Sequence, residues 1–202
     1  MWGGVVDIPL KYKSEFISNS NWLKIGFHSD SPVFNNKITK HEFRTSINEV
    51  NNAINRFADT SVIAKTLRLH YYFCPDSLIH CLENVTTLLC ADSKNRISYN
   101  LTIEEANYIF NNNQIIKDNL KYIKTNIRLE NHINIGKELR KLQDQDTLVI
   151  FTHEWALIPQ TPRQILSILL HEHRFQCNTV VKNNLEKTLQ WLNEHEYKYS
   201  FL

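Results

Sequence analysis

The chain has 202 residues, with 23 lysines and arginines against 21 aspartates and glutamates, and its formal net charge is +2. A protein that binds nucleic acid mainly through phosphate contacts usually carries a clustered basic excess, and this sequence has none, so we expect no nucleic-acid partner. Hydrophobic residues make up 42% of the chain, which is enough for one sizeable core and excludes wholesale disorder.

The amino-terminal segment, the apolar runs and the cysteines predict the cellular location of the protein. Residues 1–9 lack the basic start and the long apolar stretch of a signal peptide. The most apolar runs, 148–151 and 165–170, are far shorter than the roughly 20 residues needed to cross a bilayer. The four cysteines show no CxxC spacing and are expected to be free thiols: Cys74, Cys81, Cys90 and Cys177. These features predict a cytoplasmic protein with no membrane partner.

Short segments of period two alternate along the chain with longer segments of period 3.6. The predicted strands, in order, are 22–28, 66–72, 86–92, 125–130 and 147–153. The predicted helices are 41–58, 76–85, 102–112, 132–142, 161–173 and 183–195. Thr102 and Glu105 have the spacing of a capping box, and Pro162 follows Thr161 at a helix start. Strands that alternate with helices favour parallel pairing, so the predicted fold class is α/β.

The predicted strands are apolar on one side and polar on the other. Leu67 and Leu69 alternate with Arg68 and His70, for example. A parallel strand covered by helices on both faces is normally apolar throughout, so a polar side must face water or paired groups. This pattern favours a distorted (β/α) barrel with mostly parallel strands, in which the polar side chains line a pocket.

Five predicted strands in 202 residues are too few for a closed barrel of eight strands and about 250 residues. We therefore predict a single domain over residues 1–202, an incomplete barrel whose first strands are missing. Two explanations stay open. The chain is a fragment of a longer product, or it is an open barrel whose edge is covered by its own amino-terminal segment or by a partner, such as a second copy in a homodimer.

Polar side chains follow the predicted strands at their carboxyl ends, and in parallel α/β proteins these ends share one rim where catalytic groups are found. The candidates are His28, Arg68, His70, Asp92, Arg128, Glu130, His153 and Glu154. His28 with Asp30 suits a divalent metal, although a buried, hydrogen-bonded histidine explains the pattern equally well. His153 ends the most hydrophobic strand and suits proton transfer, and Trp155 suits an apolar wall or simple packing.

Several well-known motifs are missing from the sequence. The segment from His153 to Leu157 lacks the second histidine of the HExxH zinc motif. The sequence also contains no GxGxxG, GxxxxGK[ST] or GxSxG pattern, which removes the sequence argument for dinucleotide binding, P-loop nucleotide binding and the serine-hydrolase elbow.

Three segments together resemble the polysaccharide deacetylase superfamily, also called NodB-like, and within it an uncharacterised bacterial branch. These segments are 22–29, 67–71 and 148–153, and the resemblance spans roughly residues 9–155. It implies a distorted (β/α) barrel in which His28 is a metal ligand, Arg68 belongs to the arginine-bearing motif and His153 is the general acid. Two family features are absent. Ser31 and Pro32 occupy the region of the second ligand histidine, which leaves Asp30 as a candidate substitute, and no Asp-Asp pair precedes His28.

The first functional hypothesis is a metal-dependent hydrolase that acts on an acetylated carbohydrate. A divalent ion such as zinc on His28, aided by Asp30 or His70, would lower the pKa of a bound water. His153 would protonate the leaving group, and Asp92 would act as the base. The residues expected to bind substrate are Arg68, Arg128, Glu130, Glu154 and Trp155. The alternative is a catalytically inactive barrel that binds a glycan or a partner protein.

Overall fold

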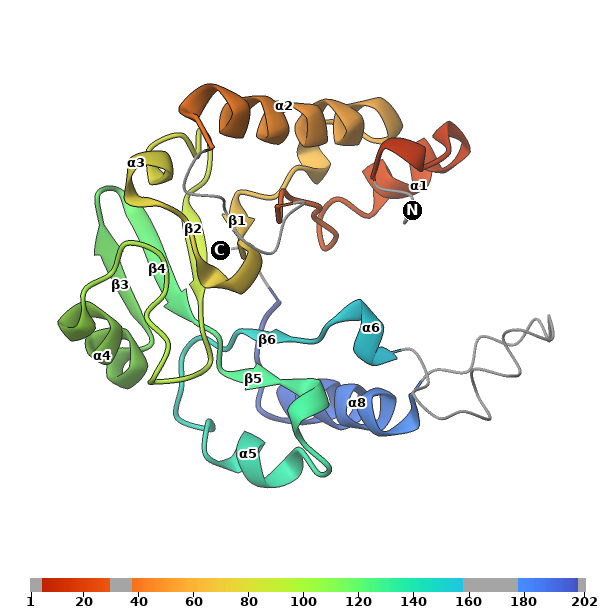
Figure 1. Ribbon diagram of the computed structural model, residues 1–202. Coiled ribbons are helices and arrows are strands. Elements are labelled where there is room, and N and C mark those ends of the chain that lie inside the picture. Colours follow the sequence, from red (N-terminus) through yellow and green to blue (C-terminus); the bar gives the residue numbers. More distant parts are fainter. Residues whose placement is uncertain (1–4, 30–37, 158–177, 200–202) are drawn as a thin grey trace, which may run out of the picture. The chain divides into compact units, whose positions relative to one another are not determined.

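The computed structural model describes residues 5–29, 38–157 and 178–199 (Figure 1). The chain divides into two compact units, Met1–Lys124 with Tyr199–Leu202, and Thr125–Lys198. Each unit has its own cluster of buried hydrophobic side chains. The predicted helix 161–173, together with Asp30 and Cys177, lies outside the described residues.

A four-stranded sheet in the order β1-β2-β4-β3 forms the centre of the first unit. β1 (Thr66–Leu67), β2 (Thr87–Cys90) and β4 (Leu120–Lys124) are parallel, and β3 (Gln114–Lys117) is antiparallel to β4. Asp118 and Asn119 connect β3 to β4, and both have positive φ angles, 50° and 63°. Tight hairpin turns require this conformation, which aspartate and asparagine tolerate. None of the strands predicted from the sequence covers this hairpin.

Two helices of the first unit begin at capping boxes. α2 (Lys40–Phe57) is capped by Thr39 and Glu42, and α4 (Ile103–Asn112) is capped by Thr102 and Glu105. The apolar face of α2 is buried, and the ring of Phe43 meets that of Phe27 edge-to-face at 5.9 Å. These two helices confirm the predictions for 41–58 and 102–112. The remaining helices of the unit are α1 (Lys13–Ser18), α3 (Asp76–Ile79) and the 3₁₀ helices Val5–Asp7, Leu10–Tyr12, Thr60–Val62 and His70–Tyr72.

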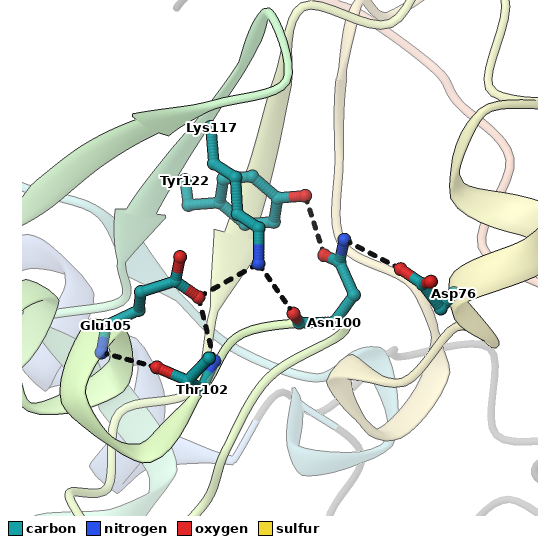
Figure 2. Close-up of polar contacts among 6 residues, drawn as sticks. All are labelled: Asp76, Asn100, Thr102, Glu105, Lys117 and Tyr122. Carbon is teal, nitrogen blue, oxygen red and sulfur yellow. Dashed lines mark hydrogen bonds and ion pairs between the residues drawn. The ribbon is translucent and has the colours of Figure 1, made fainter.

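A polar network connects α4 to the β3–β4 hairpin (Figure 2). Lys117 Nζ lies 3.0 Å from Glu105 Oε2 and donates to the Asn100 carbonyl at 2.9 Å. The Tyr122 hydroxyl donates to the Asn100 side chain, which in turn donates to Asp76. The backbone N–H of Thr102 lowers the pKa of Glu105 although burial opposes this, and Lys117 adds to the lowering. Together these contacts connect α4, the hairpin and Asp76 through Asn100 within the first unit.

The second unit contains a two-stranded parallel sheet. β5 (Ile127–Arg128) pairs with β6 (Ile150–Phe151), and a 3₁₀ helix, Leu129–Asn131, follows β5. Its helices are α5 (Gly136–Arg140), α6 (Glu154–Leu157) and α8 (Thr179–Glu194). The core of the unit consists of Ile127, Leu129, Ile135, Leu139, Ala156 and Val181. Leu129 and Ile135 are almost completely buried, so the chain around the 3₁₀ helix is anchored in this core.

Several elements are shorter than the sequence predicts. Segment 22–28 contributes one isolated bridge, between Ile25 and Ile63. The predicted strand 66–72 ends at Leu67, and further along the chain Tyr71 and Tyr72 adopt positive φ angles of 53° and 56° and bend it. Tyr71 is consequently 52% exposed instead of buried. The predicted helix 76–85 is the four-residue α3. The fold is α/β with mostly parallel strands, and the described residues form no closed barrel.

The described cysteines are buried free thiols, namely Cys74, Cys81 and Cys90. Burial raises the pKa of Cys74 and that of Cys90 to about 12. Within the same described ranges, no helix has both the length and the apolar character that a membrane crossing requires.

Candidate functional site

A histidine and a glutamate meet at one edge of the second unit's sheet. Glu130 is the central residue of the 3₁₀ helix that follows β5, and His153 lies two residues beyond the end of β6. Because β5 and β6 are parallel, both side chains emerge at the carboxyl ends of adjacent strands. His153 Nδ1 lies 2.5 Å from Glu130 Oε1, and the Thr152 hydroxyl donates to Glu130 Oε2 at 2.9 Å. The carboxylate is thus bound at both oxygens.

The Glu130 carboxylate is more deeply buried than its partner. The side chain of Glu130 is 8% exposed, and that of His153 is 20% exposed. Burial by itself raises the pKa of Glu130, but hydrogen bonds from His153, from the backbone and from Thr152 outweigh it and lower the pKa. The carboxylate is therefore ionised at neutral pH and can only accept a hydrogen bond, so Nδ1 of His153 carries the donated hydrogen. In the neutral imidazole, Nε2 is then the nitrogen that binds a proton.

The Phe151 ring packs against the side chains of Arg128 and His153. The guanidinium carbon of Arg128 lies 5.0 Å from the centre of the Phe151 ring, and the His153 ring meets that ring edge-on at 5.3 Å. Arg128 is the last residue of β5, and Phe151 is its partner in the strand register. This packing brings a positive charge and an imidazole into contact with the same aromatic ring.

Candidate residues also lie together in the first unit. His28 Nδ1 hydrogen-bonds the carbonyl of Arg68, and the N–H of His70 donates to the carbonyl of His28 at 3.0 Å. The rings of His28 and His70 are 5.2 Å apart between centroids. Arg68 lies directly beyond β1, and its guanidinium carbon is 5.7 Å from the Tyr72 ring. Asp92 lies two residues beyond the parallel strand β2, at the same edge of the sheet, and is half-buried.

The described donors do not complete a metal site. In residues 5–29, 38–157 and 178–199, no three histidine, cysteine, aspartate or glutamate side chains gather closely enough to hold a metal ion. The two imidazoles of His28 and His70 are the nearest approach to the predicted ligand set, whose third member, Asp30, lies outside the described residues. We therefore assign no chemical step to a metal.

The remaining predicted site residues belong to α6. Glu154 and Trp155 form its first turn, and their side chains lie outside the described part of the chain. The expectation that the His28 group and the His153 group share one cavity stays a prediction, because each group belongs to a different unit.

The structure assigns two of the candidates a relationship that the sequence did not reveal. Glu130 is expected from the sequence to bind substrate, but its carboxylate is hydrogen-bonded to His153. Thr152, which also donates to Glu130, is not among the candidate residues. Thr152 directly precedes His153, but the β5–β6 register that brings it to Glu130 cannot be read from either segment alone.

No family model, curated protein or solved structure matches the chain.

Proposed function

We propose that the protein is a hydrolase of the polysaccharide deacetylase type that removes acetyl groups from a carbohydrate. The observation that supports the proposal most is the hydrogen bond between His153 Nδ1 and the buried Glu130 carboxylate. A carboxylate that orients an imidazole and fixes its tautomer is a recurring arrangement for general acid–base catalysis. The resemblance of residues 67–71 and 148–153 to the family's motifs supplies the substrate class.

In this proposal His153 exchanges protons with the substrate through Nε2. The hydrogen bond from Nδ1 to Glu130 orients the His153 ring, so that a proton on Nε2 can pass to the departing sugar oxygen or nitrogen. General acid catalysis of this kind contributes roughly 10²- to 10⁴-fold to a rate. Arg128, held against Phe151, supplies positive charge for a developing oxyanion. Asp92, the expected base, belongs to the first unit, so its role stays a prediction.

Acetate release tests the proposal directly. Wild-type protein is incubated with acetylated xylo-oligosaccharides and with N-acetylated chito-oligosaccharides, and acetate is quantified. We expect release from one of these substrates and a loss of about 100-fold or more in His153→Ala. The matched control is His195→Ala, since His195 lies in the same unit but is exposed and stacks on Trp191. Equal rates in the two variants would contradict the assignment of His153.

A second candidate function is a protein that binds a glycan or a partner protein without chemistry. The observation that favours it is the lack of three clustered metal donors among the described residues. Zinc titration of the wild type and of His28→Ala separates the two. Stoichiometric uptake that is lost in His28→Ala, together with acetate release, supports the metal-dependent hydrolase. Glycan binding with neither uptake nor release supports the second function.

The incomplete (β/α) barrel, the homodimer and the cytoplasmic location are part of the first proposal. β3 is an outer strand of the first unit's sheet as the structure describes it, and the outer edge of a sheet is a typical place for a second copy to add a strand. Light scattering at micromolar concentration tests this, and a monomeric mass would argue against the homodimer.

A further inference from the structure

Asn184 is a buried polar residue within the core of the second unit. It belongs to α8, and 1% of it is exposed. Its side-chain Nδ2 donates to the carbonyl of Leu129 at 3.2 Å and to the carbonyl of His132 at 2.6 Å. Both hydrogens of one amide group are therefore used, and both bonds connect α8 to the same short segment 55 and 52 residues earlier in the chain.

The two carbonyls bracket the turn that carries Glu130. The 3₁₀ helix spans Leu129–Asn131, and the backbone N–H of His132 closes it by donating to the carbonyl of Leu129 at 3.4 Å. A single 3₁₀ turn has poor hydrogen-bond geometry and little stability of its own. Asn184 binds the first carbonyl of this turn and the carbonyl just after it, so the backbone on both sides of Glu130 is held in place.

The surroundings make the amide difficult to replace. Val181 precedes Asn184 by less than one turn of α8 and packs in the core with Leu129, so water cannot readily substitute for a missing donor. The Thr188 hydroxyl donates to the carbonyl of Asn184 at 2.7 Å, which adds a hydrogen bond within the helix. Aspartate has nearly the same shape but only accepts hydrogen bonds when ionised, so it cannot serve the two carbonyls.

We infer that Asn184 is a positioning residue for the Glu130–His153 pair. It fixes the turn from the core side, and this fixed turn holds the Glu130 carboxylate 2.5 Å from His153 Nδ1. Its effect on hydrolysis rests on the proposed function, whereas its effect on the hydrogen bond does not. Asn183, its neighbour in sequence, is exposed and has no such role.

The first readout needs no substrate. In protein labelled with ¹⁵N-histidine, the Nδ1–H of His153 that donates to Glu130 gives a downfield proton signal, which is assigned by its loss in His153→Gln. We expect this signal in the wild type, in Asn183→Ala and in Thr188→Val, and its loss or exchange broadening in Asn184→Ala. Thr188→Val removes a buried hydrogen bond of the same helix but leaves both bonds to the turn, so it controls for general destabilisation. An intact signal in folded Asn184→Ala would overturn the inference.

The second readout is acetate release by the same variants. We expect kcat to fall roughly 10- to 100-fold in Asn184→Ala, with a smaller change in KM, because misplacing a catalytic group by about 1 Å costs on this order. In a Glu130→Gln background the substitution should add little further loss. If Asn184→Ala does not fold, Asn184→Ser, which keeps one donor, takes its place in both measurements. If the wild type releases no acetate and Asn184→Ala loses the Nδ1–H signal of His153, the positioning role is supported and the proposed hydrolase is contradicted. Normal kcat in Asn184→Ala with an active wild type would overturn the positioning role alone.

Discussion

Glu105 in the first unit and Glu130 in the second are both carboxylates bound by a basic side chain, and in both the pKa is lowered. Glu105 accepts from the Thr102 N–H and from Lys117, whose ammonium also donates to a backbone carbonyl (Figure 2). Glu130 accepts from Thr152 and from His153. Lysine ordinarily keeps its charge at neutral pH, whereas histidine is the side chain that changes charge there. The chemistry of the partner therefore separates a structural pair from one suited to proton transfer.

The largest effect should come from exchanging the two carboxylates for amides, one at a time. Glu130→Gln removes the carboxylate that orients His153 through Nδ1, so acetate release is expected to fall about 100-fold. Glu105→Gln should leave release within a factor of about two, since the Glu105 carboxylate accepts its hydrogen bonds from the helix cap and from Lys117. Steady-state kinetics gives the rate of acetate release of each variant relative to that of the wild type. Similar losses in both would abolish the distinction between the pairs.

Glu105 should matter for the stability of the first unit. Glu105→Ala removes both the capping-box contact to Thr102 and the ion pair with Lys117, and we expect a loss of about 1–2 kcal/mol in the free energy of unfolding. Glu49→Ala is the control, because Glu49 is an exposed residue in the interior of α2 and does not belong to the network. Urea unfolding measures both. A Glu105→Ala protein as stable as the control would show that the network in Figure 2 adds nothing to the fold.

The pH dependence of stability should reveal the lowered pKa of Glu130. A carboxyl group whose pKa is lower in the folded protein stabilises the fold above its ordinary pKa of 4.5, and this contribution disappears as the pH falls through the folded value. Wild type should therefore lose more stability than Glu130→Gln between neutral pH and acid. Unfolding curves at a series of pH values test the sign, which a parallel decline of the two proteins would contradict.

The smallest expected signal is the reactivity of the buried thiols near the first unit's network. Burial raises the pKa of Cys74 and of Cys90 to about 12, and alkylation requires the thiolate. At pH 8 we expect no labelling of either residue in the native wild type and full labelling in urea, by peptide mass spectrometry. Slow labelling should appear in Glu105→Ala if the network helps to close this core. Rapid labelling of native wild type would mean that the core is open to solvent.

The sequence predicts local features of this protein better than distant ones. Periodicity locates α2, and periodicity with a capping box locates α4; both signals act within a few positions. Glu130 and His153 were both recognised as polar residues at strand ends, but their contact depends on the register of two very short strands. The predicted strands were too long because an alternating pattern continues into extended or bent chain such as Leu69–Tyr72. A buried asparagine such as Asn184 is indistinguishable in sequence from the exposed Asn183 beside it.

The turn at Asp118 and Asn119 has a consequence for how the first unit assembles. β3 and β4 are joined by two residues, so their pairing requires almost no loop closure, and hairpins of this kind form in about 1–10 μs. The pairing of β4 with β2 must wait for the intervening chain, which includes α4, to be arranged. We therefore expect the hairpin to form early and to serve as the template onto which β2 and then β1 are added.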